Sequence, residues 1–434
     1  MKIRTSVWLV LALLALYSPA QAQTYTMGEA VDYAMKTNPG VEAKQLLLEQ
    51  AYMNVGVAQS YFWPRVSLVS SSNQLKNSGQ VGSTDDLSSQ YWSQGVRVSM
   101  SLFAGFSHLN NLQKSRLTVD VEEARHRQAR LELGTNIQIQ FLQLLGSREE
   151  LKSAEASIKR IQTQLKAAQS FVNVGMAPYL NVLQNEVELS KAQQQVIRIR
   201  NDIRNAEVVL NKYLGFSPDA AVRYKGNLKD FSGVVGYTEE DAIKTALYSR
   251  PDLIIAQKSV AVAFKDMNIA LGGLLPRADV SYDNMRYNKD YEEKRFTDYS
   301  RSYWAIGLNL SWEVFSGGGT VFSSLAERKR AQSLQKTYED TMSGARTDVI
   351  RSLLDINAAK ELIAVTRKGM DAARESYAMA NKRYLTHTGT ITELLDAQLK
   401  LTNAENDASK ALMEFHKSRA KFFYHIGREN SALQ

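Results

Sequence analysis

Apolar and polar residues alternate along four separate stretches of the chain. The clearest stretch is 302–315, where every second residue from Trp304 to Val314 is large and apolar. A period of two residues is typical of a β-strand that has one apolar face. The pattern therefore predicts four strands, at about 65–72, 91–103, 277–286 and 302–315.

Elsewhere the apolar residues follow a helical period. A seven-residue spacing of apolar side chains runs from Ile137 to Val172, and a second one runs from Val349 to Tyr384. Small companion residues such as Ala154 allow neighbouring helices to approach closely. A continuous helix of about 65 residues would be about 100 Å long. The pattern predicts two long helical hairpins, at 105–214 and 317–426.

These elements occur twice, because the chain matches itself at a constant offset of 212 residues. The matching landmarks are specific residue types: Pro39 and Pro251, Gly105 and Gly317, Leu183 and Leu395, Gly215 and Gly427. Such self-similarity indicates two copies of one structural unit. We expect a first repeat at 23–216, an inter-repeat segment at 217–237, a second repeat at 238–428 and a C-terminal tail at 429–434.

The first residues have the composition of a secretory signal peptide. Lys2 and Arg4 precede an apolar run, and Ala20 and Ala22 form a small-residue cleavage site. This order of basic, apolar and small residues predicts a cleaved signal peptide at 1–22. The mature chain would then leave the cytoplasm.

Composition excludes several classes of protein. The 434 residues include only 24 glycines and 7 prolines, so turns are scarce and elements are long. The absence of cysteine excludes disulfides and thiolate metal sites. A net charge of +8, without basic blocks, gives no reason to expect a nucleic-acid partner.

No catalytic or cofactor motif emerges from the sequence. The five histidines lack the spacing of a metal site, and the glycine run 317–319 lacks the lysine of a phosphate-binding loop. Glycines between a strand and a helix more simply provide backbone freedom. We therefore expect no enzyme activity, no bound metal and no cofactor.

The predicted strands suit a bilayer. Trp304 and Trp312 share one strand face at a separation that matches two interfacial aromatic belts, and Trp92 is the first-repeat equivalent of Trp304. A soluble sheet packed on helices is the alternative interpretation. Four strands are too few to close a barrel, so two or three chains would have to share one.

At this point the chain resembles the trimeric outer-membrane efflux and secretion ducts of the TolC type. The resemblance covers the whole mature chain and rests on the element order, on two turn motifs and on the strand-to-helix glycines. The first turn motif is 174–183 and the second is 383–398. The glycines, which we expect to act as barrel-to-helix hinges, are Gly105, Gly317, Gly318 and Gly319.

The resemblance implies a fold that is mainly α with β. It implies a homotrimer with a membrane β-barrel of four strands per chain and twelve in total, continuous with a long α-helical coiled-coil barrel in the periplasm. It also implies three partners: outer-membrane lipid, a periplasmic adaptor (membrane fusion) protein and an inner-membrane transporter of the ABC or RND type. The tip turns would then dock the adaptor; they comprise Val174, Gly175, Met176, Ala177, Pro178, Thr388, Gly389 and Thr390.

Glu393 and Asp396 are the candidate pore-constriction residues. They lie three residues apart, and threefold repetition would place six carboxylates around the axis. The alternative is local, because Thr390 and Glu393 fit a capping box, which Asp396 does not need. Tyr384 and His387 are candidate gate residues, although the heptad position of Tyr384 also suits core packing.

The first repeat departs from this charge pattern. Asn181 and Gln184 stand where the second repeat has Glu393 and Asp396, so only one repeat supplies charge. Gly389 stands where some relatives carry a basic gating residue.

The sequence thus predicts a passive outer-membrane exit duct for a tripartite efflux pump or a type I secretion system. A soluble periplasmic coiled-coil adaptor or scaffold is the alternative. Small-molecule efflux and protein secretion both remain open as the cargo class.

Overall fold

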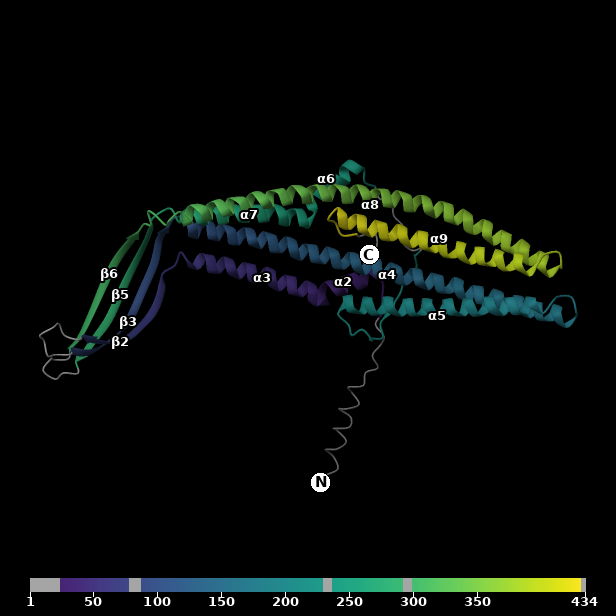
Figure 1. Ribbon diagram of the computed structural model, residues 1–434, viewed down its shortest axis with the longest axis horizontal. Helices are drawn as coiled ribbons and strands as arrows, with labels where there is room; N and C mark the ends of the chain where they lie inside the picture. Colours follow the sequence, from purple (N-terminus) through teal and green to yellow (C-terminus); the bar gives the residue numbers. More distant parts are fainter. Residues whose placement is uncertain (1–23, 78–86, 229–235, 292–298, 431–434) are drawn as a thin grey trace, which may run out of the picture. The chain divides into compact units, whose positions relative to one another are not determined.

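The computed structural model describes residues 24–77, 87–228, 236–291 and 299–430 (Figure 1). The predicted signal peptide at 1–22 lies outside these residues. The chain forms two compact units. The hairpin unit comprises Met1–Lys44, His126–Pro251 and Met342–Gln434, and the sheet unit comprises Gln45–Arg125 and Asp252–Thr341. None of the helices in the described ranges has the length and hydrophobicity needed to cross a membrane.

Among the described residues, the first half of the chain contains seven elements, and the second half repeats the same seven kinds in the same order. The first set is β1 (Thr24–Tyr25), α2 (Met27–Thr37), α3 (Pro39–Ser60), β2 (Arg65–Asn77), β3 (Leu87–Ala104), α4 (Ser107–Asn173) and α5 (Leu180–Leu214). The second set is β4 (Arg223–Tyr224), α6 (Glu239–Ser249), α7 (Pro251–Gly272), β5 (Arg277–Tyr291), β6 (Tyr299–Ser311), α8 (Gly319–Leu385) and α9 (Ile391–His425).

Corresponding helices have the same lengths. The long helices α4 and α8 both have 67 residues, and their partners α5 and α9 both have 35. The shorter α3 and α7 both have 22 residues, and α2 and α6 both have 11. The offset of 212 residues seen in the sequence is therefore also present in the backbone.

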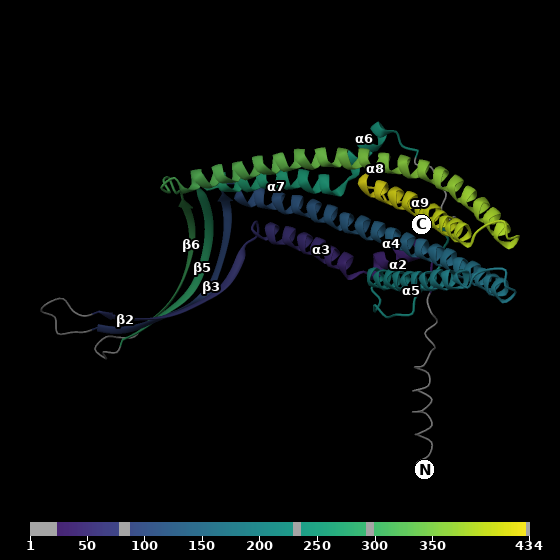
Figure 2. The same cartoon turned by 45° about the vertical axis from the view of Figure 1, so that its right-hand side comes forward.

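The sheet unit contains a four-stranded antiparallel sheet with the order β2-β3-β5-β6 (Figure 2). The register of the second hairpin repeats that of the first: Arg65 lies opposite Ser99, and Arg277 lies opposite Ser311. A bulge interrupts the central β3–β5 pairing between Ser101 and Phe103. Strand β2 extends to Asn77, beyond the predicted end at 72, whereas β6 ends at Ser311, before the predicted end at 315.

Backbones approach closely where β3 turns into α4. Gly105 has φ +60°, and a Cβ atom there would lie 2.1 Å from the carbonyl oxygen of Gly272 at the end of α7. A left-handed φ and this contact each favour glycine. The next residue, Phe106, also has a positive φ of 63°.

The main core of the hairpin unit lies around helix α2. Apolar residues of α2 pack against the middle of α4 and the end of α5, and the fully buried members include Ala30, Ile137, Phe141, Leu144 and Leu210. A complete capping box of Thr26 and Glu29 begins α2. Beside this core, β1 pairs in parallel with β4. The heptad residues Ile137 and Leu144 of α4 are fully buried in this core, as their spacing predicts, whereas Leu151 and Ile158 further along the helix are partly buried.

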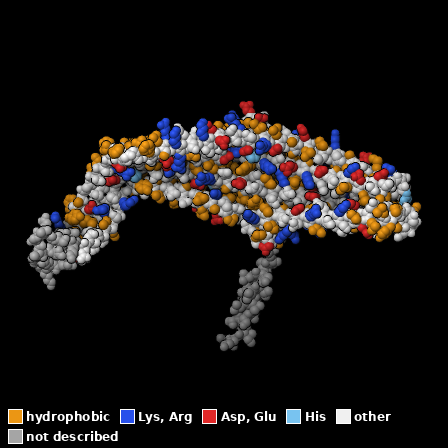
Figure 3. Space-filling model, in the orientation of Figure 1, with side chains coloured by type: hydrophobic (Ala, Val, Ile, Leu, Met, Phe, Trp, Pro, Cys, Tyr) orange, Lys and Arg blue, Asp and Glu red, His pale blue; other side chains and the backbone are white. Residues whose placement is uncertain are grey.

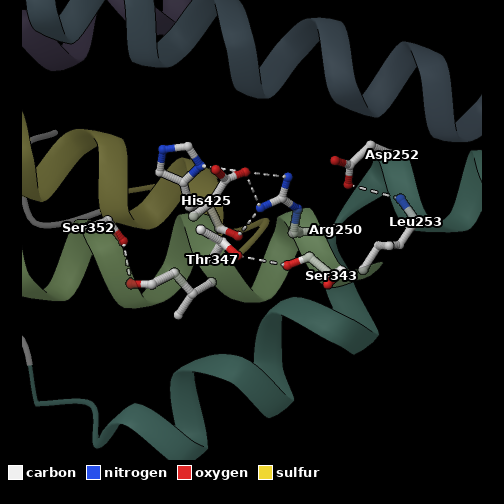
Figure 4. A network of polar contacts seen from close by, with 9 residues as sticks. Arg250, Asp252, Leu253, Ser343, Thr347, Ser352 and His425 are labelled. Atoms are coloured by element: carbon white, nitrogen blue, oxygen red, sulfur yellow. Dashed lines mark hydrogen bonds and ion pairs between the residues drawn. The ribbon is translucent and has the colours of Figure 1, made fainter. Parts of the chain in front are cut away.

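A polar network joins the end of α6 to α8 and α9 within the hairpin unit (Figure 4). The Arg250 guanidinium lies 3.2 Å from Asp348 and donates a hydrogen bond to the His425 carbonyl oxygen at 3.3 Å. Asn38 is the first-repeat equivalent of Arg250, and its amide donates to the Tyr213 carbonyl oxygen at 2.8 Å. Both side chains thus bind the last turn of the neighbouring helix, where carbonyl groups lack helical partners.

Candidate functional site: the tips of the helical hairpins

Two turns of the hairpin unit form the tips, one between α4 and α5 and the other between α8 and α9 (Figures 1 and 2). Their backbones are alike. In the first turn Met176 N donates to Phe171 O at 2.8 Å, and in the second Thr388 N donates to Arg383 O at 2.9 Å. These bonds close the last turn of each long helix, so both tips have the same local fold.

Each tip contains one residue in the left-handed conformation. Gly175 has φ +75° in the first tip, and His387 has φ +58° in the second. Glycine adopts this conformation at little cost, whereas an L-residue such as histidine is strained by about 1 kcal/mol or more. The sequence alignment of the two repeats places these two residues at the same position, but gives no φ value for either.

Aromatic side chains stabilise the strained residue. The His387 ring centroid lies 4.3 Å from that of Phe171, and the Phe171 ring also contacts Tyr384 at 5.8 Å. Tyr384 is buried in a cluster with Ile391 and Leu394. Burial raises the pKa of the Tyr384 hydroxyl. The structure therefore places Tyr384 in a local core, while His387 remains exposed beside it.

Arg383 links the two sides of the second tip. Its guanidinium donates to the Thr388 carbonyl oxygen at 3.3 Å and lies 3.6 Å from the Glu393 carboxylate. Thr390 caps α9 by accepting a hydrogen bond from Glu393 N at 3.2 Å. Only this half of the expected Thr390–Glu393 capping box appears among the described contacts, because the carboxylate lies beside Arg383 instead.

Asp396 also has a basic neighbour. Its carboxylate lies 2.8 Å from the Lys400 ammonium group, one turn further along α9. The side chains of Glu393 and Asp396 are both more than half exposed. Water therefore screens each ion pair, and neither carboxylate forms a buried ion pair. The two candidate constriction residues therefore remain accessible to ions or to another protein.

Gly389 lies close to the Arg383–Glu393 pair. A Cβ atom at Gly389 would lie 3.0 Å from Arg383 Cβ and 3.3 Å from Glu393 Oε2. Both distances are tighter than ordinary contacts, so a larger side chain would disturb the pair.

An apolar groove runs between the first turns of α5 and α9 in the hairpin unit. Its walls are Leu180, Leu183 and Val187 from α5, with Leu395 and Leu399 from α9. The adjoining turn exposes further large apolar side chains, and Figure 3 shows hydrophobic residues gathered over this end of the unit. They are Val174, Met176 and Tyr179. Exposed apolar surface rimmed by polar residues is typical of protein-interaction sites.

The expected docking residues are all at these tips. Val174, Gly175, Met176 and Pro178 are exposed, as are Thr388 and Thr390, while Ala177 and Gly389 are partly covered. Phe171 lies outside both turn motifs, and the motifs assigned no individual role to Tyr179 or Arg383. The ion pair between Arg383 and Glu393 crosses the turn, and the ring contact between Phe171 and His387 joins two hairpins. Neither contact can be read from a periodic spacing of residues along one helix.

The candidate membrane-belt residues occupy different positions in the sheet unit. Trp304 is exposed on β6, opposite Asn284. Trp92 lies on β3, opposite Ser72. Trp312 lies just beyond the end of β6, and its indole N–H donates to the Leu274 carbonyl oxygen at 3.0 Å. The expectation that Trp312 sits within the strand is therefore wrong.

The candidate hinge glycines also differ from one another. Gly105, Gly317 and Gly318 have positive φ values, which supports their expected backbone freedom. Gly319 is the first residue of α8. Phe106, at the position equivalent to Gly318, has a left-handed φ without being glycine.

Comparison with known proteins identifies the family. A model of the family "Outer membrane efflux protein" matches residues 30–216 and 242–424, one segment in each repeat. Outer membrane protein TolC of Salmonella enteritidis is 20% identical over 403 residues, which cover 88% of this chain and 79% of that protein. Outer membrane efflux protein BepC of Brucella suis biovar 1 (strain 1330) is 21% identical over 408 residues, covering 90% and 85%.

A solved structure supports the fold. The outer membrane protein VceC of Vibrio cholerae superposes with a TM-score of 0.79 at 16% identity, covering 93% of this chain and 96% of that one. The family match confirms the resemblance found in the sequence, the location in the outer membrane and the role as an exit duct for efflux, and it sets aside the alternative of a soluble adaptor. The chain belongs to the outer membrane efflux protein family.

Proposed function

We propose that three copies of the chain form one passive duct, which outer-membrane lipid surrounds at the sheets and which the helical hairpins extend into the periplasm. A periplasmic adaptor docks at the tips, and an inner-membrane transporter of the ABC or RND type supplies the energy. The chain itself then catalyses no reaction. Its contribution is a path across the outer membrane and a tip that can open.

The observation that carries the proposal is a row of apolar residues across all four strands. Val66, Val98, Tyr282 and Ile306 lie opposite one another on one face, and the row beside it on the other face is Ser67, Arg97, Asp283 and Ala305. A lipid-facing apolar surface with a polar opposite surface is the pattern of a membrane β-barrel. Four strands cannot enclose a lumen, so several copies must contribute.

The tip contacts support a gating role. Arg383 joins the end of α8 to the start of α9, and both of its partners are exposed contacts that water can replace. The neighbouring apolar groove offers an adaptor a surface beside these contacts. Docking in the groove would compete with the packing of α5 and α9, and so would favour an open tip. Asp396 and Glu393 would give the constriction a preference for cations.

Planar-bilayer recording of the purified protein tests the gate. If the Arg383 contacts hold the tip closed at rest, as we propose, wild-type protein should give small, cation-selective conductance steps. Replacing Arg383→Ala removes both tip contacts and should raise the conductance several-fold. Arg374→Ala is the matched control. Among the described ion pairs, Arg374 pairs only with Asp371, which lies one turn earlier on the same helix α8. Equal conductance of all three proteins would contradict a gate at Arg383.

Native mass measurement tests the assembly separately. Protein extracted from the outer membrane in mild detergent should have three times the mass of the mature chain. A monomeric mass under those conditions would contradict the shared duct.

A further inference from the structure

One face of the four-stranded sheet (Figure 2) is apolar only over the part of the strands nearest the helices. Along β6, the exposed side chains on this face, counted away from the start of α8, are Leu310, Leu308, Ile306 and Trp304. The next row across the sheet contains no aliphatic side chain, and its members are Ser70, Gln94, Arg286 and Ser302. These four residues are named the Arg286 row. The surface that the proposed duct presents to lipid therefore ends at this row.

The position of the Arg286 row matches the level of lipid headgroups. Trp312 and Trp304 lie eight residues apart, near the two ends of the apolar stretch. Eight tilted residues span about 20 Å, close to the height of about 25 Å of the apolar band in membrane barrels. The Arg286 row follows the row of Trp304, and Trp92 occupies the row after that. Tryptophans of this kind mark the headgroup level of a bilayer, so Arg286 lies at that level.

This level belongs to the outer leaflet of the membrane. Strand β5 begins at Arg277, soon after α7 ends at Gly272, and Arg286 lies further along the strand toward Tyr291. In the proposed duct the helices extend into the periplasm, so the strand ends remote from the helices face outward. The outer leaflet of an outer membrane is largely lipopolysaccharide, whose lipid A anchor carries phosphate groups beside its acyl chains.

A shallow depression of about 560 Å³ lies over the Arg286 row. The row forms the polar part of the lining, and Leu68, Val96 and Asn284 of the row nearer the helices form the rest of the lining on this face. Leu68 is 86% exposed. The depression thus places one cation beside exposed aliphatic side chains, which suits a phosphate group that is attached to acyl chains.

The exposed Arg286 guanidinium has no counter-charge among the residues that the structure describes. Its Nε donates to the Ser300 hydroxyl at 3.3 Å, and the rows on either side contain no carboxylate. The nearest carboxylate on this face of β5 belongs to Asp290, four residues further out. By contrast, Arg97 on the opposite face lies 2.6 Å from Asp283. A basic side chain at the membrane surface without a protein partner attracts anionic lipid.

We infer that the Arg286 row binds a phosphate group of lipid A. The inference rests on the proposed function, because it names the lipid that meets the outward end of the membrane-facing surface. A guanidinium binds two phosphate oxygens through parallel N–H bonds. Gln94 and Ser302 flank Arg286 in the row and donate to the remaining oxygens. The acyl chains of the same lipid lie along the exposed Leu68 and Ile306.

Lipid A suits the depression better than a free phosphate ion does. A free ion would gain only the contacts of an exposed guanidinium, which water and salt weaken. The acyl chains of lipid A hold its phosphate at the level of the row, so the local concentration of phosphate there is high. A phosphate monoester also carries a charge of about −1.5 to −2, more than the single charge of a phospholipid diester.

The first repeat does not duplicate this cation, because the equivalent of Arg286 is the uncharged Gln74. Each copy therefore supplies one Arg286 row, built from all four of its own strands. A duct of three copies has three such rows. Binding of lipid A should accordingly saturate at three molecules per duct.

Native mass spectrometry of the delipidated full chain in mild detergent tests the inference. The probes are diphosphorylated lipid A, an analogue with the same acyl chains and hydroxyl groups in place of both phosphates, and phosphatidylglycerol. We expect lipid A to bind about fivefold more tightly than the dephosphorylated analogue. Equal binding of these two would overturn the inference. Equal binding of phosphatidylglycerol and lipid A would assign the row to anionic phospholipid and overturn lipid A as the ligand.

Inorganic phosphate distinguishes the lipid from the free ion. It should leave bound lipid A in place when it is added in excess at constant ionic strength. Displacement of lipid A by inorganic phosphate would show a site for the free ion and would overturn the assignment to a lipid.

Two variants locate the site. Arg286→Gln should abolish the preference for lipid A over its dephosphorylated analogue. Arg301→Gln is the matched control, since Arg301 is exposed on the opposite face of the same sheet, opposite Tyr287, and it should keep the preference. Equal loss in both variants, or full retention in Arg286→Gln, would overturn the assignment. The comparison of the two lipids on wild-type protein decides the inference even where a variant fails to fold.

The same spectra separate this inference from the proposed function. A trimeric mass without any preference for lipid A would overturn the lipid site alone. A monomeric mass that still binds lipid A through its phosphates would support the site and overturn the assembly. A monomeric mass without that preference would overturn both.

Discussion

The Ser249 hydroxyl donates a hydrogen bond to the Ile426 carbonyl oxygen at 2.7 Å, where α6 ends beside the last turn of α9. The same bond occurs one repeat earlier, from the Thr37 hydroxyl to the Leu214 carbonyl oxygen at 2.9 Å. Both bonds satisfy carbonyl groups that a helix end leaves without a partner. The repeat therefore extends from sequence landmarks to individual atoms.

We expect Ser249→Ala and Thr37→Ala each to destabilise the hairpin unit by about 1 kcal/mol, the usual net value of a partly buried hydrogen bond. Thermal unfolding of the purified protein, followed by circular dichroism, measures the change. Ser343→Ala, at an exposed position of α8, is the control and should leave the unfolding temperature unchanged. Destabilisation by Ser343→Ala, without destabilisation by Ser249→Ala or Thr37→Ala, would contradict the stabilising role of the two hydrogen bonds.

Two glycine-to-alanine substitutions should change stability in opposite directions, one at the left-handed residue of the first tip and one inside a helix. Gly175→Ala should destabilise the tip by about 1 kcal/mol, since φ is +75° and only the backbone is strained. Gly344→Ala lies inside helix α8 with open space around the new Cβ, and should stabilise by about 0.5–1 kcal/mol. Urea unfolding of both variants checks the signs. Stabilisation by Gly175→Ala would show that the tip does not hold this conformation.

A buried histidine should make stability depend on pH. Burial, with a smaller contribution from Arg419, lowers the pKa of His416 to about 4 from an ordinary 6.5. The unfolded chain therefore binds a proton below about pH 6.5 that the folded chain excludes until about pH 4. The stabilising contribution is complete above pH 6.5 and is lost as the pH falls through this window, by up to about 1.4 kcal/mol per pH unit.

Unfolding temperatures measured between pH 7 and pH 4.5 check this dependence. His416→Gln should reduce the slope in this window, even though it lowers stability at pH 7 through poorer packing. His387→Gln, at an exposed position, should keep the wild-type slope. Parallel slopes for wild type and His416→Gln would exclude His416 as the source.

The carboxylates of α9 should set the ion preference of the duct. Asp396→Asn is expected to lower the permeability ratio of cations to anions, because it removes one of the two charges that each copy contributes. Gln184→Glu, at the equivalent position of the first repeat, should raise the ratio. Reversal potentials under a potassium chloride gradient measure both. Unchanged potentials in both variants would place the constriction elsewhere.

Periodicity predicted the helices and strands well, because burial repeats at fixed spacings along each element. It misplaced Trp312, since alternation of apolar residues continues past Ser311 although β5 offers no partner beyond Arg277. The strand therefore ends, and Trp312 bonds to Leu274 instead. Pairing partners, which lie far away in the sequence, decide where a strand stops.

At the tips, too, local features could be predicted from the sequence, whereas contacts between distant residues could not. The residues at the turns could be identified from the sequence, as could the equivalence of Gly175 and His387. The ring contact between Phe171 and His387 could not, because it depends on how two hairpins pack. The partner of Glu393 was also missed: its local capping pattern was visible, whereas Arg383 approaches only after the turn has formed.

The claim that this protein forms an exit duct is tested most directly in a deletion strain that carries either the wild-type gene or an empty vector. Drug and detergent susceptibility, retention of a fluorescent efflux substrate and the secreted proteins are measured on the same cultures. We expect deletion to impair export and the wild-type gene to restore it. Raised susceptibility with intact secretion would identify small-molecule efflux, and loss of a few large secreted proteins would identify type I secretion. A deletion strain that matches its parent in every readout would contradict an exit duct.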